Sequence, residues 1–579
     1  MGRTIGFLFV IASVLAACAP SRPVATNPAN SSGQPQTAAS GGGAAPSRIV
    51  IGMDEDIKNF WESVTLGGGS GARELADIFN QHLVAITADG SPTPRLLAEL
   101  PSVEKGTWKV QPDGTMETTF KLRPNVVWHD GTAFTGEDLA FSFQVNRDPN
   151  IPNSNRDAMR LIDHWEVVDP TTVVVFWSQS YPFADRMEHR DLYPLPKHLL
   201  EATYAQGSPE AFLASPYFNT DYVGLGPFKV GAWEFGSYVE FTAFDRYFLG
   251  RPKLDTIRVT FIPDNNTMVA NLNARAIQVM LTLGSVPQLD AMVGVKREWE
   301  ASGYGTVLMD PISYRFVEPQ IFHNPQPQDL TNPKVRQALL TGIDRASLAN
   351  VAMGEFGMVA DSWVHPSFGT YRVLQDAMTK YPYDQRRARA LIEEAGWRPG
   401  ADGVLEKAGQ KFNLVARDST GEADFLVVAG NWKELGVNAT FELRTAAALR
   451  DRQDRASFSG VEITSNPMGV AAVVRKSASY NIPKEENRWT GTNRGGYANP
   501  AWDELELRML GALDEGARID IEKALLQTYT TDLPLLPLYF RNDMVPVGGG
   551  LKGPVANTGV AHRGFILHTW NVHEWQLGA

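Results

Sequence analysis

The sequence has a single cysteine, Cys18, among its 579 residues. One thiol cannot form a disulfide within the chain, and it cannot supply a cysteine-based metal site. The fold must therefore be held by an apolar core, which a chain of this length is large enough to build. The length itself predicts two to four domains.

The sequence also lacks an excess of basic residues. It has 53 Lys and Arg against 65 Asp and Glu, which gives a formal net charge of −12. Domains that bind nucleic acid, or that are held on anionic lipid by charge, carry the opposite balance. The composition therefore argues against a nucleic-acid partner and offers no basic surface for lipid.

Long apolar runs and catalytic motifs are missing as well. Beyond the N-terminal segment, no stretch reaches the ~18 consecutive apolar residues of a transmembrane helix. The chain contains no H-E-x-x-H, G-x-S-x-G or paired-cysteine motif. Acidic pairs such as Glu485-Glu486 and Asp54/Asp56 are more typical of a solvated surface than of a glycosidase dyad. We expect no cofactor, and a cell-surface hydrolase is the less favoured alternative to a binding protein.

Three histidines near the C-terminus, His562, His568 and His573, are the one group that suggests a metal. Their spacing matches no metal-binding motif. We therefore expect packing rather than coordination from all three, and a surface or structural place for His189 and His198.

The N-terminal segment is the first positive signal. Met1–Cys18 has a basic start, an apolar run and small residues before the cysteine, which is the layout of a secretory signal. Leu15-Ala16-Ala17-Cys18 resembles a bacterial lipobox, in which the cysteine is diacylated and becomes the first residue of the mature protein. Residues 19–47 are rich in Pro, Ser, Ala and Gly and cannot bury enough surface to fold. The sequence thus predicts a lipid anchor at Cys18 followed by a disordered tether.

The most informative passage is Thr119–Val145. Phe120 and Leu122 alternate with charged residues as in a half-buried strand, and Asp130-Gly131 predicts a turn. Thr135 is then placed to cap a helix, with Asp138 at the capping-box position. The passage is therefore predicted to be a strand–turn–helix packing unit without catalytic chemistry.

Other helices are indicated by spacing and by their ends. Leu75, Ile78, Phe79 and Leu83 fall at helical spacing in 70–86. Asn332-Pro333 and Tyr383-Asp384 each open a helix, and Gly396 ends the second of these. A further helix over 425–435 is predicted to end at Gly436.

The string F-K-L-R-x-x-V-x-W-x-D-G-x-x-F-T-x-E-D-L-x-F-S closely resembles the signature region of the family 5 extracellular solute-binding proteins. At least seven more motifs resemble that family in the same order along the chain, among them V-G-L-G-P-F at 223–228 and V-R-Q-A-L at 335–339. The resemblance runs from about Ile49 to about Tyr539. The chain departs from it at Leu225, Arg275 and Gln278.

The resemblance implies an α/β fold of the periplasmic-binding-protein type, a two-lobed clamp of type II, cluster C, with an extra subdomain and mixed sheets flanked by helices. The expected parts are a signal peptide at 1–18, a tether at 19–47, lobe I at 48–90, 216–310 and 531–579, the extra subdomain at 91–215, and lobe III, the closing lobe, at 311–530.

The resemblance also implies a function. Such a protein captures a solute between its lobes and delivers it to an ABC permease and ATPase complex, with oligopeptide or dipeptide as the default solute. An oligosaccharide or another non-peptide solute is the alternative. We expect a monomer at the bacterial cell envelope, periplasmic or on the cell surface, held to the membrane only through its anchor.

The expected ligand residues follow from the same comparison. Peptide-binding members place an acidic residue, for the peptide's amino group, at the position that corresponds to Ser465 and Asn466 here, and neither of these is charged. A peptide amine would then be bound without a salt bridge, which favours neutral or anionic solutes. The expected ligand-binding residues are Trp61, Trp363, Ser465, Asn466, Trp489 and Arg494, the last able to meet a carboxylate.

Overall fold

The computed structural model describes residues 46–61, 72–151, 157–281, 289–418, 423–445, 448, 451–560 and 566–578. Cys18 and almost all of the expected tether lie outside the described residues. Ser47 is already part of the packed structure, because its backbone N–H donates to Asp255 Oδ2 at 2.8 Å. Among the described residues, no helix is both long enough and apolar enough to cross a membrane.

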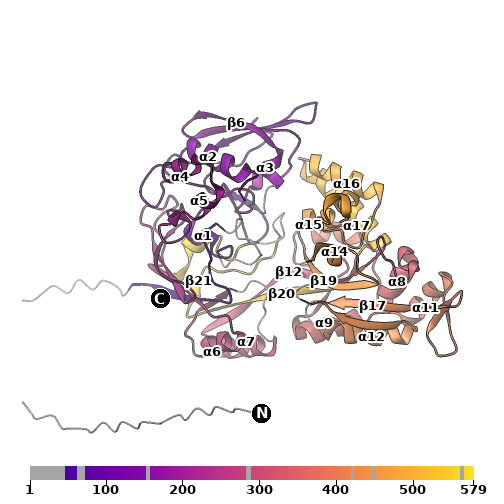
Figure 1. Cartoon of the computed structure of the whole chain (residues 1–579). Helices are drawn as coiled ribbons and strands as arrows, with labels where there is room; N and C mark the ends of the chain where they lie inside the picture. The colour runs from indigo at the N-terminus through magenta and orange to yellow at the C-terminus, as the bar shows by residue number, and fades with distance from the viewer. Residues whose placement is uncertain are drawn as a thin grey trace, which may run out of the picture. The chain divides into compact units, whose positions relative to one another are not determined.

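One mixed sheet of eleven strands organises the described structure (Figure 1). The strand order is β18-β17-β19-β12-β20-β11-β1-β10-β9-β8, and β13 pairs with β20 beside this path. The bounds are β1 Arg48–Met53, β8 Phe228–Glu234, β9 Tyr238–Ala243, β10 Thr256–Phe261, β11 Val279–Leu281, β12 Gly305–Pro319, β13 Met358–Val359, β17 Asn413–Asp418, β18 Asn438–Leu443, β19 Val461–Pro467 and β20 Leu536–Gly548.

Strands β12 and β20 are the longest of this sheet, and we call them the crossing strands. They are antiparallel and stay paired from Gly305 opposite Gly548 to Val317 opposite Leu536. The register shifts twice, between Pro311 and Ser313 and between Arg315 and Phe316. At one end β20 pairs with β11, and at the other end β12 pairs with β19. The crossing strands thus extend across both parts of the sheet, and most of residues 311–530, the expected closing lobe, lie between them in the sequence.

A second sheet, of order β4-β5-β7-β6, lies in the expected extra subdomain. Its strands are β4 Trp108–Val110, β5 Met116–Lys121, β6 Ile162–Asp169 and β7 Thr172–Trp177, and helix α2 spans Gly136–Arg147. Thr135 caps α2 in a capping box, and its backbone N–H donates to Asp138 Oδ2 at 2.9 Å. The turn before it has Gly131 at φ +96°. The predicted strand–turn–helix unit is confirmed.

The helix expected from spacing in 70–86 is wrong over most of its length. Of the described residues 72–86, only α1, Ala76–Phe79, is helical, and Val84–Ile86 forms strand β2, which pairs with β3, Pro92–Pro94. The chain leaves the helix at Asn80, whose Oδ1 accepts from the Leu225 backbone N–H at 3.2 Å. Apolar residues at helical spacing are buried here by tertiary contacts on both sides of that break, which local periodicity does not distinguish from one helix.

The capped helices of the closing lobe begin and end where expected. Helix α8, Pro333–Thr341, has Asn332 as its N-cap, and α11, Gln385–Glu394, has Asp384. Gly396 at φ +93° and Gly436 at φ +94° follow the ends of α11 and of α12, Ala423–Leu435. A left-handed residue just past a helix satisfies its last carbonyls, and glycine adopts that conformation without strain.

The remaining α-helices cover the sheets, and five short strands form two small antiparallel sheets. The bounds are α3 Asp157–Leu161, α4 Lys197–Tyr204, α5 Pro209–Leu213, α6 Asn265–Asn273, α7 Leu289–Ser302, α9 Arg345–Met353, α10 Tyr371–Leu374, α14 Arg452–Ala456, α15 Val470–Lys476, α16 Pro500–Gly511 and α17 Glu515–Asp532, with β14 Arg398–Pro399, β15 Leu405–Lys407, β16 Gln410–Lys411, β21 Leu551–Lys552 and β22 Gln576–Leu577.

In the closing lobe the sheet is buried on both faces (Figure 1). Helices α8, α9, α11 and α12 cover what we call the Arg315 face, where Val317, Ile463 and Tyr539 are buried. Helices α15, α16 and α17 cover the opposite, Tyr314 face, with Phe316 and Phe540. Successive strand residues point to opposite faces, so neighbours in sequence enter different cores.

Candidate functional site

The carboxyl ends of three parallel strands of the closing lobe meet at one edge of the sheet. Strand β17 is parallel to β18 on one side and to β19 on the other. At the end of β19, Pro467 lies opposite Ser313 of β12, which lies opposite Arg541 of β20. In open α/β sheets ligands bind outside the carboxyl ends of such strands, where the strand order reverses. This edge, next to the crossing strands, is the candidate ligand site.

Ser465 and Asn466 are at this edge, but they project to opposite faces. Ser465 lies opposite Arg315, and Asn466 lies opposite Tyr314. The Ser465 hydroxyl is buried and has no hydrogen-bond partner. The Asn466 amide donates to the Pro467 carbonyl at 3.1 Å. A single ligand group therefore cannot use both side chains in the same way.

A buried ionic network surrounds Ser465 on the Arg315 face. Arg315 donates through Nη2 to Asp418 Oδ2 at 2.5 Å and through Nε to Asp424 Oδ2 at 2.7 Å. The Tyr539 hydroxyl donates to Asp424 Oδ1 at 3.0 Å. The network joins the end of β17, the first turn of α12 and both crossing strands.

The charges of this network hold each other in place. Burial alone would lower the pKa of Arg315, but the Asp424 and Asp418 carboxylates outweigh it and raise that pKa. Burial and the Asp424 charge together raise the pKa of Tyr539, so its hydroxyl stays a donor. The Asp424 side chain keeps 12% of its surface exposed, whereas that of Asp418 has none. Asp424 is thus the more exposed of the two carboxylates in this network.

Sequence reasoning missed Arg315, Asp418, Asp424 and Tyr539 because no motif joins them. One signal was available. Arg315 interrupts the apolar strand 314–317, and a charge inside such a strand is normally paired when it is buried. Its partners, 103 and 109 residues away, were not available from spacing.

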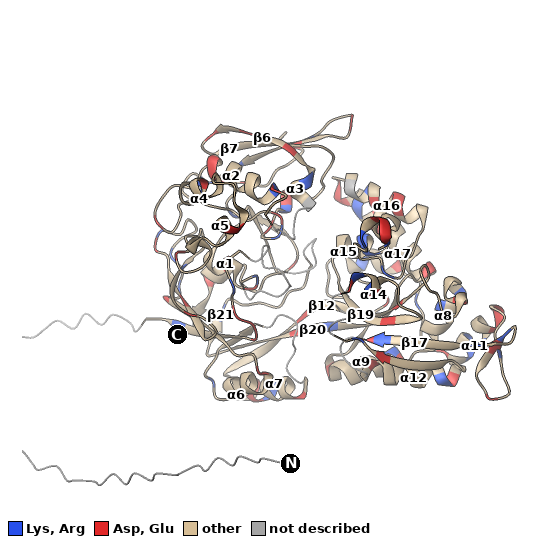
Figure 2. Cartoon of the chain, in the orientation of Figure 1, with Lys and Arg blue, Asp and Glu red and all other residues tan. Residues whose placement is uncertain are grey.

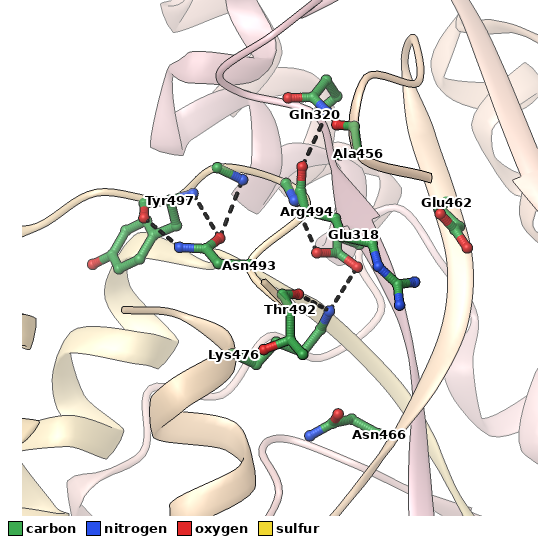
Figure 3. Close-up of polar contacts among 12 residues, drawn as sticks. Glu318, Gln320, Ala456, Glu462, Asn466, Lys476, Thr492, Asn493, Arg494 and Tyr497 are labelled. Carbon is green, nitrogen blue, oxygen red and sulfur yellow. Dashed lines mark hydrogen bonds and ion pairs between the residues drawn. The ribbon is translucent and has the colours of Figure 1, made fainter. Parts of the chain in front are cut away.

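Trp489 and Arg494 lie at the other end of strand β19. Gln320 Nε2 donates to the Arg494 carbonyl at 3.1 Å and to the Ala456 carbonyl at 2.9 Å. Gln320 is six residues beyond Tyr314 on β12, or about 20 Å along an extended strand. Figure 3 shows Asn466 apart from the contacts around Arg494. The structure therefore does not bring Arg494 together with Asn466.

The loop that carries Trp489 and Arg494 is fixed by buried polar groups. Glu318 accepts from Lys476 Nζ at 2.9 Å and from the Gly495 backbone N–H at 2.9 Å, and Lys476 Nζ also donates to the Thr492 carbonyl at 3.1 Å (Figure 3). Trp489 is half-buried at φ +58°, with its ring centroid 5.2 Å from that of His323.

The two remaining candidates are core residues in this structure. Trp61 has no exposed surface and stacks on Tyr193 and Phe218, with centroids 5.9 and 5.6 Å away. Trp363 is 1% exposed and donates through Nε1 to Glu522 Oε1 at 3.3 Å. Burial raises the pKa of Glu522 to about 7. The six candidates thus occupy separate places rather than one pocket.

Acidic and basic residues are interspersed over helices α11, α12, α16 and α17 (Figure 2).

Within the described ranges, no three His, Cys, Asp or Glu side chains are grouped to hold a metal. His568 Nδ1 lies 3.1 Å from Asp310 Oδ2, and the half-buried His573 ring packs on Tyr247. His562 lies outside the described residues.

Comparison with known proteins agrees with this architecture. The model of the bacterial extracellular solute-binding proteins, family 5 (middle), matches residues 100–463, more than half of the chain. The chain belongs to this family. The resemblance seen in its motifs is thereby confirmed, as are the two-lobed clamp and the capture of a solute.

Two curated relatives show how far the similarity extends. The chain is 26% identical over 449 residues to the oligopeptide-binding protein AppA of Bacillus subtilis, which is 76% of this chain and 78% of AppA. It is also 26% identical over 352 residues to the dipeptide-binding protein of Escherichia coli, 57% of this chain and 61% of that protein.

Solved structures give the same fold. The crystal structure of NikA from Brucella suis in complex with Fe(III)-EDTA superimposes with a TM-score of 0.72 at 18% identity, over 92% of this chain and all of NikA. At that identity the likeness concerns the fold alone.

Proposed function

We propose that this solute-binding protein is the lipid-anchored capture subunit of an ABC importer and that its default solute is a peptide. The observation that carries the proposal is the family match over 100–463, together with the names of its relatives, which bind oligopeptides and dipeptides. Its partners would be the solute, a permease and ATPase complex, and the membrane through the anchor.

The proposed ligand site is the carboxyl edge of β17 and β19. Ser465 and Asn466 remain ligand residues in this proposal, and Asp424 joins them as the acidic group for a peptide's amine. Its 12% exposure and its place on the Ser465 face support this role. Trp489 and Arg494 would contact only a ligand that extends about 20 Å along the lobe, and Trp61 and Trp363 would support the fold.

Native mass spectrometry of the protein as purified tests the solute class. A co-purified peptide would support the proposal, and synthetic versions of it should then bind Asp424→Asn at least tenfold more weakly by calorimetry. Glu485→Gln, an exposed carboxylate outside the network, is the matched control. Failure to bind any peptide, glycan or metal chelate would contradict the proposed function.

A non-peptide solute is the second candidate, because Ser465 and Asn466 are both uncharged. Sugar hydroxyls would pair with the Ser465 hydroxyl and the Asn466 amide. In that case the co-purified species is a glycan, and Asp424→Asn leaves its affinity unchanged.

The anchor is proposed from the sequence alone. Two or more acyl chains on Cys18 would give stable membrane attachment, whereas one chain gives marginal attachment. Mass analysis of the mature N-terminus should show a diacylglyceryl cysteine. Cys18→Ser should release the protein from the membrane fraction.

A further inference from the structure

The crossing strands carry two buried carboxylates directly opposite each other. Asp310 of β12 pairs in register with Asp543 of β20, and the two are 1% and 8% exposed. Directly opposed residues of an antiparallel pair have Cβ atoms about 5 Å apart, and like charges there are destabilising. The register shift between Pro311 and Ser313 follows at once. Such irregularities bend a strand.

The C-terminal segment adds an imidazole to this pair. His568 Nδ1 lies 3.1 Å from Asp310 Oδ2, and the Asn557 backbone N–H donates to Asp310 Oδ1 at 2.8 Å. On the other strand, the Met544 backbone N–H donates to Asp543 Oδ1 at 2.9 Å.

Among the described residues, Glu74 and Arg541 are further charged groups to consider beside the cluster. Glu74, in the segment before α1, is 9% exposed and has Arg73 Nε at 3.1 Å. Half-buried Arg541 lies two residues before Asp543 on β20. Burial raises the pKa of Asp543 to about 6, the nearby His568 opposes this, and Glu74 and Asp310 reinforce it. Burial also raises the pKa of Asp310.

We propose that Asp310, Asp543 and His568 form a proton-sensitive hinge that couples the angle between the two lobes to pH. The crossing strands extend across both parts of the sheet, so a change of that angle bends them. One proton on a carboxylate oxygen of the pair removes the like-charge repulsion and favours the close strand pairing seen here. Its loss favours a bent arrangement in which the two carboxylates separate.

Pulsed electron paramagnetic resonance, which measures the distance between two spin labels, tests the hinge without any solute. Because Cys18 is the only cysteine, the full chain with Cys18→Ser, Val168→Cys and Leu507→Cys carries labels at two positions only. Val168 on β6 and Leu507 on α16 are 62% and 70% exposed, so labelling should not disturb packing. We expect the distance distribution to shift between pH 8 and 5 with a midpoint near pH 6.

Variants separate the hinge from other titrations. Asp310→Asn and Asp543→Asn should abolish the shift, and Asp543→Glu, which keeps a carboxyl at this position, should retain it. Glu522→Gln removes a buried carboxyl whose pKa is also raised but which lies on α17, so it should leave the shift intact. His568→Gln removes the opposing charge and should move the midpoint to higher pH.

Two results would overturn the hinge: a distribution that does not change from pH 8 to 5, or a shift that persists in Asp310→Asn. If the asparagine variants fail to fold, the test rests on the distance distributions of two other proteins: the one with the unsubstituted hinge and the one with His568→Gln. A fixed midpoint in His568→Gln would then count against the proposal. Solute binding does not enter this test, so its failure would leave the proposed function untouched.

Discussion

The two ends of strand β19 hold buried polar groups in different ways. At its amino end, Glu318, Gln320 and Lys476 bond to one another or to backbone groups, among them those of the 492–497 loop. At its carboxyl end, Arg315 is shared by two carboxylates and the Ser465 hydroxyl has no partner. The bonds of these three side chains brace a loop, whereas the Ser465 hydroxyl keeps bonding capacity for a ligand.

The amino-end brace should give the largest stability effect. Lys476→Met leaves Glu318 buried without its positively charged partner, and Glu318 lies opposite Glu462 in the strand register. Removal of one partner of a buried ion pair costs about 3–5 kcal/mol. We expect the free energy of unfolding in urea to fall by about 3 kcal/mol.

Two variants control for this effect. Lys476→Met combined with Glu318→Gln should recover much of the loss, because residue 318 then carries no charge that needs a partner. Lys334→Met breaks an exposed pair with Glu394 and should change stability by less than about 1 kcal/mol. Equal losses from Lys476→Met and Lys334→Met would show that the amino end is not a brace.

The Glu522 carboxyl, behind the Tyr314 face, tests whether burial alone, without a charged partner, changes the stability of the fold. Burial raises the pKa of Glu522 from 4.5 to about 7. A raised folded-state pKa stabilises the protein below the unfolded value and loses that stabilisation as pH rises through about 7. Between pH 5 and 8 the wild type should therefore lose about 2 kcal/mol more than Glu522→Gln. Urea midpoints across this range measure it, with exposed Glu515→Gln as the control. Parallel curves for wild type and Glu522→Gln would contradict the prediction.

The N-cap of helix α2 is an ordinary local contact, and its loss gives a reference for the stability effects expected at the two ends of β19. Thr135→Ala removes the N-cap of α2 in the extra subdomain and should lower the free energy of unfolding by about 1 kcal/mol. Thr528→Ala is the matched control, because that hydroxyl bonds within helix α17 and caps nothing. If both variants lose the same stability, the capping box adds nothing.

The extent to which sequence predicts this protein follows the same division. The capping box at Thr135 and the glycine after α11 were predictable, because each depends on residues within a few positions. The break at Asn80 was not, because its side chain bonds to residue 225. For the site, the family resemblance singled out Ser465 and Asn466 as candidates, and they stay a prediction. It could not show that they face opposite sides of the sheet, or that Asp424 lies on the Ser465 side.

At the carboxyl end of β19, the smallest substitution should change the affinity for the solute rather than the stability of the fold. Ser465→Ala removes a buried hydroxyl without a partner, so the free energy of unfolding should stay within about 0.5 kcal/mol of the wild type. If a bound solute forms a hydrogen bond with that hydroxyl, calorimetry with the co-purified solute should show about tenfold weaker binding to the variant, equivalent to about 1.4 kcal/mol. Arg494→Ala, held at the far end of β19, is the control and should leave the affinity of a short solute unchanged. Stronger loss from Arg494→Ala than from Ser465→Ala would reverse the roles of the two ends, because the brace would then be the surface that the solute contacts.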